Sequence, residues 1–436
     1  MKKWLVALLV LLALLVLISP GIVGMLAERE MEEAVSQAER GSPGISVTTE
    51  RFEREWFTSE GRHRIELTGG EMYATASEVA REAGQDSVPA LVINTELQHG
   101  IRQGSGGILP VLARSVSTLQ LETGDGEVFD VPGTLNTEVS LTGITSSRYL
   151  LDAGSFASDG AEGVWEGADM LFTISPSGSA GSVSGTIDPW SIQAEVSGLR
   201  AGSTSIDATV RDSEFGFRTG SVDLEIDGLS VSDANGIVEL QKLSLQSRSE
   251  LDGRRVEARA DVSVGQLMIP GTGEVNVVAS ASASGIDAAS LRQLLAALES
   301  AESSMNPNPA LAAMDGLVGA DLQGLLNRGA DIRIDRLDLE LPQGAMHATL
   351  DFDLPQSDSG ELKPWASLAL QLTASANIEI DDSLLQFAQS IIPEIGSLIG
   401  LGFLRRDGNV YRLAAEVKNG QLTINGAPMA LPMSFD

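Results

Sequence analysis

The stretch Gly220–Leu240 reads GSVDLEIDGLSVSDANGIVEL, and from its pattern we predict the fold. Apolar and polar residues alternate from Val222 to Ile226, which is the period of a β-strand with one solvated face. Dipeptides typical of tight turns follow at Asp227–Gly228 and at Asn235–Gly236. Alternating runs joined by such dipeptides predict an antiparallel sheet.

The same alternation recurs on both sides of this stretch. Further strands are expected in ISVTTERF from Ile45, DIRIDRLDLEL from Asp331, AMHATLDFDL from Ala345, SLALQLTASANIEI from Ser367 and VYRLAAEV from Val410. Small residues fill many of these positions, which favours a long sheet over a compact globule. We divide this β-rich body into residues 45–205 and 206–436.

Helical periodicity interrupts the second part at about residues 287–328 and 382–404. Asp287 is the expected N-cap of a segment with leucines at helical spacing, and Asn308–Pro309 is the expected start of another helix. Pro393 should kink or divide the last segment, which is apolar almost all round. Its candidate contacts with a hydrophobic ligand or a protein interface are Leu384, Phe387, Ile391, Ile395, Leu398 and Phe403. The predicted fold class is mainly β (α+β), an elongated antiparallel β-sheet body with a few amphipathic covering helices.

The N-terminus predicts a membrane anchor. Trp4–Ala27 carries no charge and is long enough to cross a bilayer core of about 30 Å as a helix. A signal peptide cleaved near Ser19-Pro20-Gly21 is the alternative. Lys2 and Lys3 precede the span, so the N-terminus should be cytoplasmic. We therefore expect a transmembrane helix at 1–27, a helical stem and linker at 28–44, and a body in the periplasm, attached to the bacterial inner membrane.

The composition argues against several functions. The 436 residues carry a net charge of −31, which repels nucleic acid, and no cysteine is present. The three histidines, His63, His99 and His347, are far apart and show no metal-ligand spacing. Because nucleophile and phosphate-binding motifs are missing as well, we expect no cofactor and no enzymatic activity.

One charged stretch, RFEREWFTSEGRHRIEL at Arg51–Leu67, contains an adjacent aromatic pair. Together with the preceding span and stem, it resembles the bacterial YdgA-like family. The residues that match the family pattern are Phe52, Arg54, Trp56, Phe57, Ser59, His99 and Gly100. Glu55, Thr58 and Ile101 depart from the pattern, whereas NGQLTINGAPM near the C-terminus is similar to the family's closing strands.

This resemblance covers essentially the whole chain. It implies an anchored envelope protein and brings no catalytic residue. For the pair itself, we expect that one ring packs in the sheet core and that the other covers the stem helix or a sheet edge.

Two functions stay open. The protein either binds a lipid or another hydrophobic ligand on an apolar sheet face, or serves as a partner or scaffold in an envelope assembly or a surface-motility complex. In the second case the helical segments would be core covers or a homo-oligomer interface. The sequence does not say whether the apolar strand face is filled by the protein's own helices or by a ligand.

Overall fold

The computed structural model describes residues 44–70, 73–74, 76–77, 81, 87–103, 110–124, 126–158, 161–194, 197–233, 236–302, 328–355, 365–392 and 395–429. Within these ranges no helix is long and apolar enough to cross a membrane. The expected anchor and stem, residues 1–43, lie outside the described residues, as does the expected helix after Asn308 up to residue 327.

The chain forms two units. Unit 1 contains the chain up to Gly154 and Glu166–Ile187, and unit 2 contains Ser155–Trp165 and Asp188–Asp436. The strands of unit 1 are β1 (Ile45–Arg54), β2 (Thr58–Leu67), β3 (Ala90–Gln103), β4 (Pro110–Glu122), β5 (Val128–Ser140), β6 (Thr145–Leu151), β9 (Ala168–Ile174) and β10 (Ala180–Ile187). They pair antiparallel in that order.

Unit 2 is also an antiparallel sheet, and it contains the longest of the described strands. The strands before the first helix are β7 (Gly154–Ser158), which starts at the unit boundary, β8 (Ala161–Trp165), β11 (Trp190–Ala194), β12 (Gly198–Ala201), β13 (Thr204–Asp212), β14 (Arg218–Ile226), β15 (Leu229–Asp233), β16 (Gly236–Asp252), β17 (Arg255–Ile269) and β18 (Gly273–Asp287). The later strands are β19 (Ala330–Leu341), β20 (Gly344–Leu354), β21 (Thr373–Asp381), β22 (Arg405–Asp407), β23 (Val410–Lys418), β24 (Gln421–Ile424) and β25 (Ala427–Met429). The helices are α3 (Ala288–Glu302), α6 (Trp365–Gln371), α7 (Asp382–Ile391) and α8 (Ile395–Gly400).

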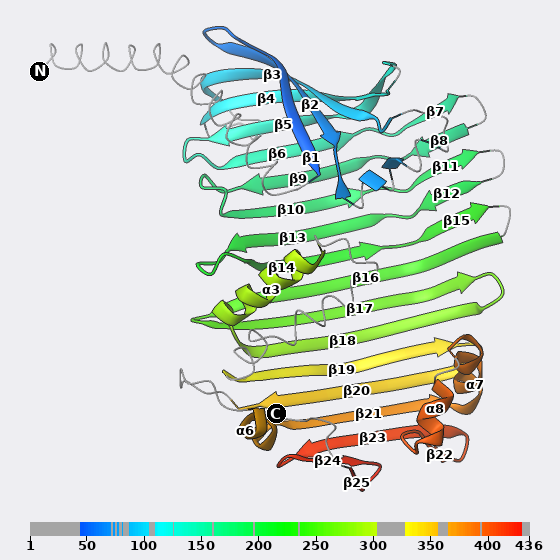
Figure 1. Cartoon of the computed structure of the whole chain (residues 1–436). Coiled ribbons are helices and arrows are strands. Elements are labelled where there is room, and N and C mark those ends of the chain that lie inside the picture. The colour runs from blue at the N-terminus through cyan, green and yellow to red at the C-terminus, as the bar shows by residue number, and fades with distance from the viewer. Residues whose placement is uncertain are drawn as a thin grey trace, which may run out of the picture. The chain divides into compact units, whose positions relative to one another are not determined.

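The stretch Gly220–Leu240 folds as predicted, with one correction. The chain does not reverse at Asp227–Gly228, because β14 and β15 pair one after the other with the same strand, β16 (Figure 1). The neighbouring strands β12 and β13 are separated in the same way, by Gly202 and Ser203, which lie next to Asp227 and Gly228. The backbone joins the two interruptions through Gly202 N–H to the Gly228 carbonyl, 2.7 Å, and Asp227 N–H to the Ser203 carbonyl, 2.9 Å. An Asp-Gly dipeptide therefore marks a break within a long strand here.

Strand register places the apolar residues of unit 2 on one side of its sheet. Leu243, Val264 and Val277 lie opposite one another on β16, β17 and β18, and Leu240, Leu267 and Val275 form the next row. The phase of alternation changes between these rows on β16 and on β17, where the two row positions are three residues apart, and the register of β17 with β18 shifts there. Because Val275 and Val277 are two residues apart on β18, both rows face the same way. We call this side the apolar face and the opposite side the charged face.

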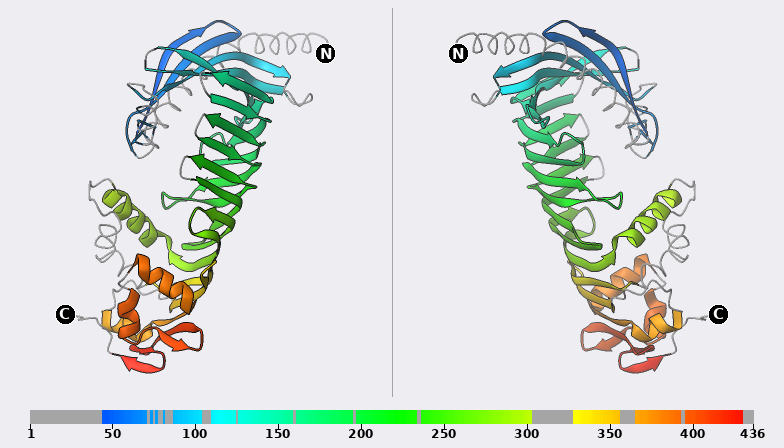
Figure 2. Two further views of the ribbon diagram at one scale, coloured as in Figure 1. Left: turned by 90° about the vertical axis from the view of Figure 1, so that its right-hand side faces the viewer. Right: turned by 90° about the vertical axis from the view of Figure 1, so that its left-hand side faces the viewer.

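The helices of unit 2 lie on the apolar side. Figure 2 shows α3, α7 and α8 on the same side of this sheet. Asp287 caps α3 as predicted, since its Oδ2 accepts a hydrogen bond from the Ser290 N–H at 3.0 Å. The last helical segment is divided into α7 and α8, which end and begin on either side of Pro393, as expected.

One predicted strand is wrong at its start. Ser367–Gln371 belong to α6, and the strand begins only at Thr373. The run SLALQ is rich in good helix formers, and a short apolar run does not distinguish a strand from a helix by period. The Gln371 side chain donates to the Ser367 carbonyl at 3.1 Å, one helical turn away.

Candidate functional site

The apolar face is built from rows of side chains that cross the strands of unit 2. Row A consists of Thr204, Ile226, Leu243, Val264, Val277, Leu339, Met346, Ile380 and Tyr411. Row B consists of Ile206, Leu224, Leu245, Val262, Ala279, Leu337, Ala348, Ile378 and Leu413. Neither row contains a charged side chain. Since neighbouring strands are about 4.8 Å apart, each row is about 38 Å long.

Most of this face is not covered by the described part of the chain. In rows A and B only Ile380 is buried, with 8% exposed, and every other position is half-buried. A sheet core sealed by its own helices buries such residues almost completely. The described residues therefore leave a broad, partly exposed apolar surface on the side of the sheet opposite to the charged face.

Helices α7 and α8 close one end of the face. Leu384 and Leu385 of α7 are buried against Ile380 and Leu404, and Met346 and Tyr411 pack around them. Of the candidate contacts expected from the sequence, Leu384, Phe387 and Ile395 belong to this packing. Ile391 and Leu398 are exposed, and Phe403 is half-buried. The sequence-derived group therefore divides into core residues and surface residues.

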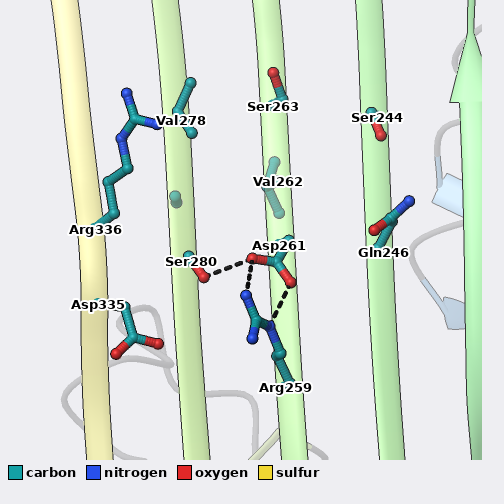
Figure 3. Close-up of a pocket in the computed structure, with 11 residues that line it drawn as sticks. Ser244, Gln246, Arg259, Asp261, Val262, Ser263, Val278, Ser280, Asp335 and Arg336 are labelled. Atoms are coloured by element: carbon teal, nitrogen blue, oxygen red, sulfur yellow. Dashed lines mark hydrogen bonds and ion pairs between the residues drawn. The ribbon is translucent and has the colours of Figure 1, made fainter.

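Two depressions lie on the charged face. One of about 430 Å³ is formed by strands β16 to β19 (Figure 3). In it Arg259 Nε donates to Asp261 Oδ2 at 2.8 Å, and Ser280 Oγ donates to Asp261 Oδ1 at 2.5 Å. The hydrogen bond from Arg259, followed by the one from Ser280, lowers the pKa of Asp261.

A second depression, of about 270 Å³, contains His347, whose Nδ1 lies 2.7 Å from Asp338 Oδ1. His347 faces the polar side, as predicted. In both depressions charged side chains pair with neighbours of opposite charge, as is usual on a solvated sheet face. In the described ranges, no three His, Asp or Glu side chains are grouped as a metal site requires.

Two short motifs found in the sequence meet in unit 1. Ser59 Oγ lies 3.2 Å from His99 Nε2, and both side chains are buried, with 2% and 0% exposed. The His99 N–H donates to the Phe57 carbonyl at 3.0 Å. Gly100 follows with φ of 100°, a conformation that favours glycine, and the register of β3 with β4 shifts there. These motif residues hold the β1–β2 hairpin against β3. Phe52 is half-buried and Arg54 is exposed in the same hairpin.

The aromatic pair is not packed as predicted. Trp56 and Phe57 lie in the loop between β1 and β2, with 55% and 47% exposed. The loop closes through the Glu55 N–H and the Thr58 carbonyl, 2.8 Å apart. Residues of a hairpin loop leave the pleat of the strands, so the strand rule that separates neighbours onto two faces does not apply to them. Both rings are presented at the surface.

Replacing Trp56 and Phe57 together by alanine should therefore lower the free energy of unfolding by less than about 1 kcal/mol, as for exposed positions. Buried aromatics would cost about 3–5 kcal/mol each. Urea unfolding of the double variant beside the parent protein measures the difference. A loss in the range for buried aromatics would show that the rings are packed after all.

A buried histidine was not anticipated. His63 has 5% of its surface exposed, its Nδ1 lies 3.1 Å from Thr49 Oγ1, and its Nε2 has no hydrogen-bond partner among the described residues. The imidazole lies over Gly61, where a β-carbon would approach Nε2 to 2.8 Å. Burial lowers the pKa of His63 and so favours the neutral imidazole in the folded protein. Because His63 lies between Arg62 and Arg64 in the sequence, its inward position could not be recognised from the pattern of residues.

The lowered pKa of His63 predicts acid sensitivity. The unfolded chain takes up this proton at about pH 6.5, before the folded protein does. The stabilising contribution is therefore complete above about pH 6.5 and is lost as the pH falls toward the lower folded pKa. His63→Gln should therefore flatten the pH dependence of urea unfolding below about pH 6.5, relative to the parent protein. An unchanged pH profile in His63→Gln would contradict this assignment.

Comparison with known proteins places the whole chain in one family. The family described as "Bacterial protein of unknown function (DUF945)" matches residues 1–432. The chain belongs to this family. No curated protein and no solved structure matches it. The match supports a bacterial family of unknown function, and the narrower resemblance to the YdgA-like family stays a prediction.

Proposed function

We propose that this DUF945 protein is anchored in the bacterial inner membrane and that its periplasmic body binds acyl chains of a lipid on the apolar face. It acts as a binding protein and not as an enzyme. The observation that carries the proposal is the extent of uncovered apolar surface in rows A and B. A ligand that covers such a surface removes it from water, which stabilises the complex by about 25 cal/mol per Å² of buried apolar surface.

The shape of the rows favours acyl chains as the ligand. One leaflet of a bilayer core is about 15 Å thick, so a row of about 38 Å has room for more than one acyl chain end to end. An acyl chain has no polar groups that need partners along rows A and B. The predicted N-terminal span, Trp4–Ala27, supports the bilayer as the source of the ligand.

Native mass spectrometry with lipid extraction tests the proposal. Full-length protein released in mild detergent is compared with residues 28–436, which lack the predicted span. We expect both to retain lipid, with a defined number of lipids on the shorter chain. Lipid found only on the full-length protein would be the shell around the span and would overturn the proposal.

A second function is favoured by the exposed hairpin loop. Trp56 and Phe57 are of the residue types that dominate protein interfaces, and they suit a partner in an envelope assembly or a second copy of this chain. A photocrosslinking residue at position 57 in cells should then capture the same neighbour reproducibly. Capture that does not differ from an exposed site such as Arg218 would argue against this role.

A further inference from the structure

The apolar face of unit 2 ends in an aromatic corner on the side away from α7. Strands β7, β8 and β11 lie at this end of unit 2, and α7 packs on β20, β21 and β23 at the other (Figure 1). Trp165 and Trp190 lie directly opposite each other on β8 and β11. Their row continues through Ala201, Leu229, Leu240, Leu267 and Val275. Since Val275 also belongs to the apolar face, the corner and rows A and B form one continuous surface.

A third ring completes the corner. Phe156 stacks on Trp165 with ring centroids 6.5 Å apart and an interplanar angle of 29°. Phe156 also lies over Gly163, where a β-carbon would come within 2.0 Å of the ring. Glycine at 163 therefore allows the ring to lie close to the strand, on the side that Trp165 occupies two residues later. Phe156 is still 43% exposed.

The corner is the open end of the apolar face. The row next to the tryptophans contains Ile192, Val231 and Val238, which are 42%, 45% and 40% exposed. At the other end Leu384 and Leu385 are 4% and 2% exposed. The side chains next to the corner are thus exposed, those at α7 are buried, and the rows between them are mostly half-buried and contain no charged side chain. A long apolar molecule can therefore enter from the corner without crossing a charged row.

We infer that the aromatic corner of Phe156, Trp165 and Trp190, with Ile192, Val231 and Val238, is where an acyl chain of a bilayer phospholipid enters and leaves the face. This inference rests on the proposed function. Tryptophan combines an apolar ring with a polar N–H and is enriched where membranes meet water. The uncharged rows behind the corner accept the rest of the chain, and the predicted span keeps the body near a bilayer.

Tryptophan fluorescence of the full chain tests the corner. Trp4, Trp56 and Trp365 are replaced by phenylalanine, which leaves Trp165 and Trp190 as the emitting residues. The protein is reconstituted into vesicles of phosphatidylethanolamine and phosphatidylglycerol with brominated acyl chains. We expect saturable quenching that vesicles without bromine do not cause.

Two neighbouring residues of β16 provide a matched pair of variants. Val238 faces the corner, and Ile237, which is 58% exposed, faces the opposite side of the sheet. Val238→Glu should slow the transfer of brominated lipid to the tryptophans by about tenfold or more, because an acyl chain would have to pass a carboxylate. Ile237→Glu should leave the transfer rate unchanged. Both sites are exposed, so both variants should fold, and thermal unfolding checks this.

The outcomes separate the corner from the proposed function. Lipid retained at a defined ratio, with Trp165 and Trp190 unquenched or with equal rates in the two variants, would overturn the corner as the entrance and leave lipid binding intact. Loss of all retained lipid would overturn the proposed function, and the corner with it. If Val238→Glu slows the quenching and Ile237→Glu does not, the result would support both lipid binding and the corner as its entrance.

Discussion

Leu385→Ala should destabilise unit 2 by about 2–5 kcal/mol, the usual range for a buried leucine that leaves a cavity. Leu385 is 2% exposed and packs with Ile380, Leu384 and Leu404 where α7 meets the sheet. Few other side chains in this unit are buried as deeply in the described ranges, so the structure has little to compensate for the loss. Urea unfolding, followed together with hydrogen exchange of the α7 amides, measures the change.

The control for Leu385→Ala lies on the same helix. Ile391 is 64% exposed, so Ile391→Ala should change the free energy of unfolding by no more than about 0.5 kcal/mol. Equal losses in the two variants would show that α7 does not have the inner and outer sides described above. The closed end of the apolar face would then need another explanation.

Leu245→Glu should abolish lipid retention, while Gln246→Glu should leave it unchanged. Leu245 lies inside row B, between Leu224 and Val262, and Gln246 is its neighbour on the charged face. A carboxylate under an acyl chain loses its water without gaining a partner, which costs far more than the about 1.4 kcal/mol that corresponds to a tenfold loss of binding. The ratio of lipid to protein after purification of the full chain is the measurement.

The two substitutions add the same charge to the same strand one residue apart. A general effect of charge, expression or detergent would therefore change both variants alike. Because Leu245 is half-buried and not sealed in a core, its variant should remain folded, which circular dichroism and thermal unfolding verify. Equal lipid retention in the two variants would contradict binding on row B.

The sequence allowed a good prediction of the strands but not of how they combine. The alternation in β14, β16 and β17 identifies strands with one apolar side, because side chains on a strand point alternately to the two faces. It does not identify the residues that lie opposite each other, which depends on pairing between distant segments. The row that joins Trp165 to Val275 therefore became visible only with the register.

The errors of prediction have local causes. Trp56 and Phe57 were assigned to a strand, whereas the hairpin turns at these residues and both rings become exposed. Asp227–Gly228 has the composition of a turn, but a matching interruption in the adjacent strand accommodates it without a reversal. His63 lies among arginines in sequence, and only the pairing of β1 with β2 places it beside Thr49.

The extent of cover over the apolar face could not be predicted from helix patterns. The segment at 382–404 is apolar almost all round, which agrees with a cover, and α7 does pack on row A at Ile380. Helix α7 contacts β20, β21 and β23, however, and α3 contacts β18, while the positions of rows A and B from β13 to β20 stay half-buried. The sequence shows which residues of a helix are apolar. Which strands the helix covers depends on where the chain leaves the sheet and where it returns to it.

The most direct test of the account is to map where a lipid touches the full-length protein in cells. Bacteria are fed a fatty acid that carries a photoreactive diazirine, the protein is crosslinked by light, and the modified peptides are identified by mass spectrometry. If acyl chains bind on the apolar face, we expect adducts on apolar-face positions of β16 to β21, such as Leu245, Val262 and Leu337, and on Trp165 and Trp190 at the corner. Adducts confined to residues 1–44, with the strands of unit 2 unmodified, would contradict it.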